Sequence, residues 1–205
     1  MIYFFIGDLM YYLEKQIENQ IIIEKSEFIT ILTPIHSLDE IDDILKSIKK
    51  KYTKANHYCS AYIFENSQGS SDDGEPSGTA GMPILDVLNK QQLHNIYAVV
   101  VRYFGGIKLG AGGLIRAYSK SISQALIDAP RLKQILVTTY EVNFNYDQIG
   151  LIDHLFKDFI TNKVYLSDVT YELSFTDDQS ILEQNKHIFI SVKEKGTKHV
   201  LVPWK

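Results

Sequence analysis

Residues 99–119 read VVVRYFGGIKLGAGGLIRAYS. Their order predicts a buried strand through Val101, a charged strand end at Arg102, a glycine-rich loop and then a helix. The predicted helix carries apolar residues at the spacing of a face that is turned to a core. These residues are Leu114, Ala117, Tyr118, Ile122, Ala125 and Leu126. The segment therefore predicts a loop between a strand and the N-terminus of a packed helix.

Five glycines fill this loop. They are Gly105, Gly106, Gly110, Gly112 and Gly113. Unpaired backbone N–H groups and the positive end of the helix dipole converge at such a point, and glycine lets an anion come close. Arg102, Lys108 and Arg116 supply positive charge, and Tyr103 lies beside them. The segment predicts an anion-binding surface, and the alternative is a tight turn that packs the helix flat on its sheet.

A second unusual segment, residues 70–85, reads SSDDGEPSGTAGMPIL. Its three carboxylates, Asp72, Asp73 and Glu75, can hold a hard cation or accept hydrogen bonds from backbone N–H groups and from arginine. An acidic turn closed by side-chain to backbone bonds is the competing interpretation. The predicted acidic loop comprises Ser71, Asp72, Asp73, Gly74, Glu75, Pro76, Gly78 and Thr79. Its three carboxylates are the candidate metal ligands.

Composition limits the kind of partner. The chain of 205 residues is 45% hydrophobic and has a formal charge of −4. Residues 1–130 hold 12 Lys and Arg against 15 Asp and Glu, and residues 131–205 hold 9 against 10. Neither part is basic, so binding to RNA needs a local patch, and sequence-specific binding to DNA is not expected.

The terminus and the cysteine content indicate a cytoplasmic protein. Residues 1–13 lack a basic region and a cleavage site for secretion, and no segment is long enough to span a membrane. The single cysteine, Cys59, excludes an intramolecular disulfide and is typical of a reducing compartment.

Local patterns predict two groups of elements separated near residues 129–134. In the first group, Ser37 and Glu40 form a capping box that starts a helix at Leu38. The predicted elements of this group are strands at 20–24, 27–33 and 57–64, a strand that ends at Arg102, and helices at 38–51, 81–89 and 113–128. The second group has strands at 136–144 and 198–202, a helix within 149–159, a hairpin around 167–168 and a helix within 178–192. That order is β-α-β-β-α-β.

Both unusual segments resemble the signature of the IMPACT/YigZ family, whose members carry SDDGEPSGTAG followed by VVRYFGGIKLGxGGL. The resemblance includes IIIEKSEFI at residues 21–29 and the pattern of His57, Cys59 and Ala61, and it covers residues 15–128. Residues 1–9 match nothing in the family, so we expect a start at Met10. The expected domains are an IMPACT-type domain at 10–130 and a smaller C-terminal domain at 135–205.

The resemblance implies an α+β fold in two domains. It implies that the first domain is like the second domain of ribosomal small-subunit protein five. It implies that the second is a ferredoxin-like domain similar to domain V of elongation factor G. Eukaryotic members of the family regulate translation under amino-acid starvation. The resemblance therefore points to a non-enzymatic binding module that contacts RNA or the ribosome, with a protein partner as a further possibility and without a cofactor.

Three alternatives remain open. A kinase-like enzyme or hydrolase would cradle phosphates with the glycine loop and use Asp72, Asp73 or Glu75 as base and metal ligands. His57 and Cys59 share a strand face and can bind zinc or form a nucleophile pair, although a buried pair in a sheet is the simpler interpretation. Tyr103 and Phe104 can stack on bases or act as hydrophobic lids.

Overall fold

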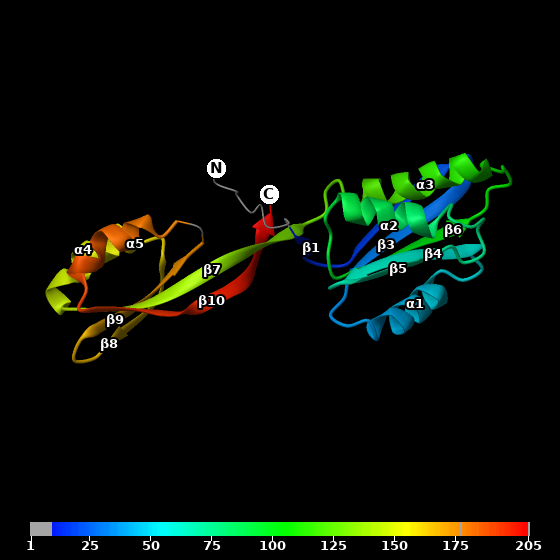
Figure 1. Cartoon of the computed structure of the whole chain (residues 1–205). Helices are drawn as coiled ribbons and strands as arrows, with labels where there is room; N and C mark the ends of the chain where they lie inside the picture. Colours follow the sequence, from blue (N-terminus) through cyan, green and yellow to red (C-terminus); the bar gives the residue numbers. More distant parts are fainter. Residues whose placement is uncertain (1–9, 177, 205) are drawn as a thin grey trace. The chain divides into compact units, whose positions relative to one another are not determined.

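The computed structural model describes residues 10–176 and 178–204 and divides into two compact units (Figure 1). Unit 1 extends to Lys133 and includes the end of the last strand from Pro203, and unit 2 is Gln134–Val202. The two five-stranded sheets and five α-helices of the described residues give a mixed α and β architecture. The expected start at Met10 concerns residues 1–9, which lie outside the described part of the chain.

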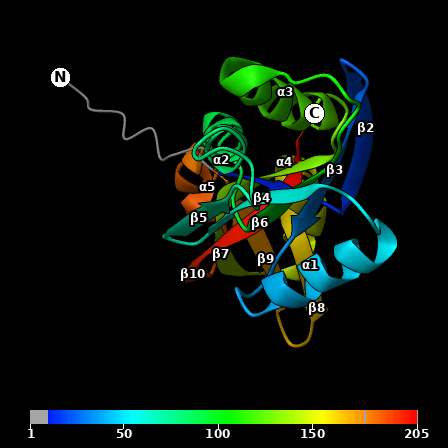
Figure 2. The same cartoon turned by 90° about the vertical axis from the view of Figure 1, so that its right-hand side faces the viewer.

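Unit 1 contains three helices around one sheet. Its elements are β1 (Tyr11–Leu13), β2 (Ile17–Ile23), β3 (Ser26–Pro34), α1 (Glu40–Lys51), β4 (His57–Phe64), β5 (Ser67–Ser71), α2 (Gly81–Lys90), β6 (Ile96–Tyr103) and α3 (Gly110–Ala125). The sheet has the order β2-β3-β6-β4-β5, and each neighbouring pair is antiparallel. Helices α2 and α3 cover one face and α1 covers the other (Figure 2).

The central strand β6 is buried on both faces, which explains its uninterrupted apolar sequence. Because side chains alternate along a strand, Ala98 and Val100 pack with α2 and α3, whereas Val99 and Val101 pack on the α1 side. The same alternation places Arg102 on the face of α2 and α3. A charged side chain thus enters a layer that is mainly apolar.

Unit 2 has the predicted order β-α-β-β-α-β. Its elements are β7 (Arg131–Phe144), α4 (Ile149–Phe156), β8 (Ile160–Tyr165), β9 (Val169–Phe175), α5 (Ser180–Asn185) and β10 (Ser191–Trp204). The strands follow the order β10-β7-β9-β8, while β1 pairs with the first residues of β7. Every second residue of β9 is buried, from Val169 to Phe175, and these residues pack with Ile152 and Phe156 of α4 and Leu182 of α5.

Several predicted boundaries are wrong for identifiable reasons. Helix α1 begins at Glu40 because Ser37 Oγ accepts the N–H of Asp39 (3.2 Å), while the Glu40 carboxylate accepts the N–H of His36 (3.0 Å). These bonds differ from the predicted capping box, in which the Ser37 side chain accepts the N–H of Glu40. In unit 2, the helix predicted to 192 ends at Asn185, and β10 begins at Ser191.

The glycine loop is shorter than predicted. Helix α3 begins at Gly110 rather than at Gly113, so Gly110, Gly112 and Gly113 belong to its first turn. The strands β1 and β5 were not predicted, and Ser71, assigned to the acidic loop, ends β5. None of the helices in the described residues is long and apolar enough to cross a membrane.

Candidate functional site

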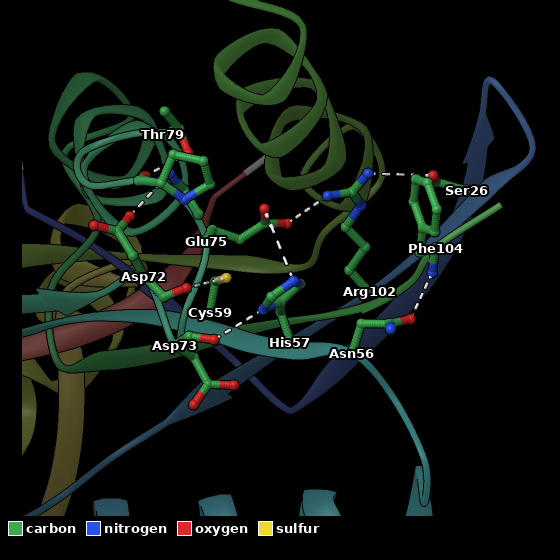
Figure 3. A network of polar contacts seen from close by, with 12 residues as sticks. Ser26, Asn56, His57, Cys59, Asp72, Asp73, Glu75, Thr79, Arg102 and Phe104 are labelled. Atoms are coloured by element: carbon green, nitrogen blue, oxygen red, sulfur yellow. Dashed lines mark hydrogen bonds and ion pairs between the residues drawn. The ribbon is translucent and has the colours of Figure 1, made fainter. Parts of the chain in front are cut away.

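A buried ion pair connects the two segments that the sequence singles out. Arg102 Nη1 at the end of β6 donates to Glu75 Oε1 of the acidic loop over 2.6 Å (Figure 3). The side chains are only 6% and 4% exposed. Burial strengthens the attraction between the two charges but removes their hydration, so such a pair depends on further hydrogen bonds.

One such bond comes from α3, and β4 places two further polar side chains nearby. Tyr118 Oη donates to Glu75 Oε1 (2.8 Å), and the Cys59 thiol lies 3.2 Å from the same hydroxyl. His57 Nε2 lies 3.9 Å from Glu75 Oε2, while its Nδ1 is 2.9 Å from the backbone oxygen of Asp73. Glu75 is thus surrounded by polar groups from three separate elements of unit 1.

The neutral groups of this network are held neutral by burial. Burial, followed by the effects of Cys59 and Glu75, raises the pKa of Tyr118 far above its ordinary value. Burial raises the pKa of the Cys59 thiol to about 12; the nearby carboxylates add to the increase, and the Tyr118 hydroxyl opposes it. A nucleophilic cysteine needs a lowered pKa, so the network does not support the nucleophile interpretation of His57 and Cys59.

Arg102 retains one unused donor. Its Nη2 donates to Ser26 Oγ (3.3 Å), but its buried Nε has no hydrogen-bond partner among the described residues. The guanidinium carbon lies 5.3 Å from the ring centre of Phe28 and 5.7 Å from that of Phe104. A buried donor without a partner is costly and is uncommon in folded proteins, so it marks a place where a ligand can contribute.

Arg102 lines a cavity of about 230 Å³ between the acidic loop and α3. We call this cavity the Arg102 pocket. Its walls are Glu75, Pro76, Arg102, Phe104, Lys108, Leu109, Gly110, Ala111 and Leu114. The pocket therefore joins the two predicted segments at one point.

The N-terminus of α3 forms one wall of the Arg102 pocket. The 16-residue helix has no side-chain cap and no acidic residue in its first turn. Its first backbone N–H groups therefore keep their capacity to bind an anion. Lys108, exposed immediately before the helix, adds a full positive charge at the rim.

The loop that leads into α3 needs glycine at one position for packing. A Cβ on Gly105 would lie 2.0 Å from the backbone carbonyl of Lys25, in the turn between β2 and β3. Gly106 and Gly110 have φ angles of +88° and +69°, which side chains rarely adopt, and open space surrounds both. These glycines set the path of the chain rather than fill a core.

The three carboxylates of the acidic loop do not converge. Asp72 accepts the N–H groups of Gly78 (2.8 Å), Ala80 (3.0 Å) and Gly81 (2.8 Å), and so caps the start of α2 from a distance. Burial raises the pKa of Asp72, but these three backbone bonds outweigh it, so the pKa lies below its ordinary value. Asp73 Oδ2 instead accepts the N–H of Tyr58 (2.6 Å).

The predicted metal set is therefore not assembled. Asp72 and Asp73 bind backbone groups, and Glu75 binds Arg102 and Tyr118. Within residues 10–176 and 178–204, no group of three His, Cys, Asp or Glu side chains is placed to hold a metal ion. The acidic loop is a closed turn instead, in which Thr79 Oγ1 donates to the Pro76 carbonyl (2.6 Å) and Gly74 and Gly78 have positive φ angles.

The structure brings together only part of the predicted ligand-binding set. Arg102, Lys108 and Gly110 line the Arg102 pocket. Arg116 is exposed and does not line the pocket. Its Nη1 lies 3.5 Å from the position that a Cβ added to Gly112 would occupy. Tyr103 packs on the α1 face and donates to the Thr53 carbonyl (3.1 Å), so it lies on the opposite face of the sheet from the pocket.

Several residues of the site were not predicted as such. Ser26 and Phe28 contact Arg102, and Tyr118, predicted as a core residue of its helix, also binds Glu75. Ser26 and Phe28 lie in the segment at 21–29 that carries the family resemblance, which was the available signal. Their contact with Arg102 depends on the pairing of β3 with β6, which local periodicity does not give.

Comparison with known proteins gives a consistent result. The family model described as the Impact N-terminal domain matches residues 24–126. IMPACT family member YvyE of Bacillus subtilis is 42% identical over 156 residues, which are 74% of this chain and 72% of YvyE. IMPACT family member YigZ of Escherichia coli is 39% identical over 138 residues, 65% of this chain and 68% of YigZ.

Among solved structures, a crystal structure described as that of a hypothetical protein covers 91% of this chain and 97% of its own. It is 28% identical, with a TM-score of 0.59. The sequence matches are the more specific result, because they extend through the acidic loop, β6 and α3, the elements that form the Arg102 pocket. On these matches, the chain belongs to the IMPACT family.

Proposed function

We propose that this protein is a cytoplasmic, translation-associated binding module in which the Arg102 pocket receives a phosphate group of RNA. Membership of the IMPACT family supports the connection with translation, because the resemblance described above includes eukaryotic regulators of translation. RNA or the ribosome is the partner that this function requires. The module acts by binding, without turnover of its own.

One observation carries the assignment of the phosphate to this pocket. The uncapped N-terminus of α3 and Arg102, whose buried Nε has no partner among the described residues, line the same cavity. Backbone N–H groups at a helix N-terminus and a guanidinium are the donors that phosphate oxygens prefer. A phosphate in this position would satisfy the helix end and lie beside Arg102 and Lys108, which line the same pocket.

The charges of the pocket suit a single phosphate. Glu75 balances Arg102, which leaves Lys108 and the end of the α3 dipole as the uncompensated positive charge. A site with so little excess charge makes few ionic contacts with RNA. Its affinity should therefore fall with salt less steeply than that of a strongly basic RNA-binding surface.

The enzyme alternative depends on carboxylates that are hydrogen-bonded to other groups of the protein. A kinase-like reaction or a hydrolysis would use the carboxylates of the acidic loop as base and metal ligands. Asp72 is occupied by three backbone N–H groups, Asp73 by Tyr58, and Glu75 by Arg102 and Tyr118. Binding is therefore the function that this geometry supports best.

The test is a polarisation assay with fluorescent RNA, both single-stranded and structured, and with ribosomal subunits as competitors, across a salt series. Lys108→Glu should weaken binding about tenfold, since it reverses the free charge at the pocket. The matched control is Lys120→Glu, the same charge change at an exposed position of α3 that does not line the pocket.

Equal losses for the two variants would show only a general charge effect and would contradict the pocket. Saturable binding of ATP or GTP with magnesium, without any affinity for RNA or ribosomes, would favour the enzyme alternative. Wild-type protein that binds none of these probes would overturn the proposed function.

A further inference from the structure

Hydrogen bonds hold the backbone at Phe104, while the residue remains exposed. Its backbone N–H donates to Asn56 Oδ1 (2.8 Å; Figure 3). The N–H of Gly105 donates to Ser26 Oγ (3.2 Å). The close approach of Gly105 to Lys25 prevents the loop from shifting inward. Despite these restraints, the Phe104 side chain is 46% exposed.

The exposed ring is part of the Arg102 pocket. Phe104 lines the cavity together with the N-terminus of α3, and its ring centre lies 5.7 Å from the Arg102 guanidinium carbon. Pro76 forms another apolar wall, and Ile107 is 39% exposed on the same loop. The N-terminus of α3 thus lies beside an exposed aromatic ring whose backbone is held in place.

We infer that the ligand of the Arg102 pocket is an unpaired nucleotide, with its phosphate at the N-terminus of α3 and its base stacked on Phe104. This inference rests on the proposed function and makes it more specific. Aromatic side chains bind bases by stacking, and a backbone that is already held in place needs no further ordering when a base covers the ring.

The size of the pocket argues for one nucleotide rather than a helix. A cavity of about 230 Å³ is smaller than the usual site for a drug-sized ligand. It has room for a phosphate and the adjacent part of a nucleotide. In a duplex the bases are already paired and stacked on one another, so they are not available to Phe104.

A simple hydrophobic lid is the competing interpretation of Phe104. A lid buries its ring over the residue that it covers, whereas Phe104 leaves nearly half of its surface open. Single exposed apolar residues are common on proteins and carry no meaning alone. Here the exposed ring coincides with an uncapped helix N-terminus and a buried arginine donor, and this coincidence is the basis of the inference.

The experiment compares inorganic phosphate, ribose 5-phosphate and AMP by calorimetry, and single-stranded oligo(A) with an RNA duplex by polarisation. Wild-type protein should bind AMP at least about fivefold more tightly than ribose 5-phosphate, the lower range for one base–aromatic stack. Phe104→Leu should abolish this difference without changing the affinity for inorganic phosphate. Phe104→Tyr, which keeps a ring, should preserve it.

Ile107→Ala is the matched control, since it removes an exposed apolar side chain from the same loop outside the lining of the pocket. Melting temperatures of all variants show whether the fold is retained. Oligo(A) that binds more tightly than AMP identifies single-stranded RNA as the source of the nucleotide, and AMP binding alone identifies a free mononucleotide.

The outcomes separate the inference from the proposed function. If phosphate probes bind but AMP and ribose 5-phosphate bind equally in wild-type protein, the base does not contribute, and the inference is wrong while the function stands. Tighter binding of the duplex than of the single strand would have the same meaning. If no phosphate-bearing probe binds, both fail.

Discussion

Glu75 and Arg102 join the acidic loop to the end of β6 through an ion pair of 2.6 Å from which water is almost fully excluded. The Tyr118 hydroxyl bonds to the same carboxylate oxygen. The pair is therefore part of the support of unit 1 as well as a wall of the Arg102 pocket.

Removal of Arg102 should strongly destabilise unit 1. Arg102→Ala leaves the Glu75 charge buried without its partner, which costs about 3–5 kcal/mol. Urea unfolding followed by circular dichroism measures this loss. The control is Lys51→Ala, which breaks the exposed pair of Lys51 with Glu18, also at 2.6 Å, and should cost much less. Comparable losses would contradict the role of burial, and Arg102→Ala is accordingly no clean test of anion binding.

Two glycines should respond to alanine in opposite directions. A Cβ at Gly105 would meet the backbone of Lys25 and Ser26 at 2.0–2.4 Å, so Gly105→Ala should cost about 1–3 kcal/mol through overpacking. A Cβ at Gly112, in the first turn of α3, would meet only the end of the Arg116 side chain at 3.5 Å. Gly112→Ala should therefore stabilise by about 0.4–1 kcal/mol, because alanine lowers the conformational entropy of the unfolded chain. Thermal denaturation of the two variants beside wild type decides the matter, and a loss at both positions would refute this account.

Asp72 should contribute stability that disappears in acid. Its pKa in the folded protein lies below the ordinary 3.8, so the unfolded chain takes up a proton first as the pH falls. The contribution is fully present above about pH 3.8 and is lost as the pH falls through the folded-state pKa. Asp72→Asn should lower the melting temperature at pH 7, and the difference from wild type should shrink below pH 3.8. A constant difference across this range would exclude the proposed linkage.

Cys59 should be inert in the native protein. Burial raises the pKa of its thiol to about 12, and the side chain has no exposed surface. A thiol-specific reagent at pH 8 should label Cys59 in urea but not under native conditions, because the thiolate is the reactive form. Glutathione in the same buffer serves as the reference for an exposed thiol. Rapid stoichiometric labelling of folded protein would show that the burial described for β4 is wrong.

The sequence predicted the elements better than the contacts between them. Long segments with a clear period, such as the buried face of α3, were placed correctly. The short strand β5 was missed, because SQGSS has no apolar alternation; it is held by pairing with β4, where a Cβ on Gly69 would lie 2.6 Å from the Tyr62 ring. The start of α3 was placed late because glycine disfavours helices, whereas the N-terminal turn tolerates it.

The role of Arg102 could not be read from its neighbours in sequence. It follows three valines, and the sequence predicted only a charged strand end there. The structure buries this residue, because Glu75, distant in sequence, folds over the end of β6. Tyr103 illustrates the same limit: the sequence grouped it with the ligand-binding residues, but the sheet places it on the α1 face, away from the pocket.

The uniform apolar sequence of β6 does little to fix the register of this strand against its neighbours. Its valines would fill either layer of unit 1 equally well if the strand slipped by one residue against β3 and β4, and a slip of this size exchanges the two faces. Arg102 removes the ambiguity. In the slipped arrangement its charge would enter the layer beneath α1, and Glu75 would remain buried without a counter-charge. We therefore expect the ion pair to disfavour the misaligned sheet, because the slip would separate two buried charges.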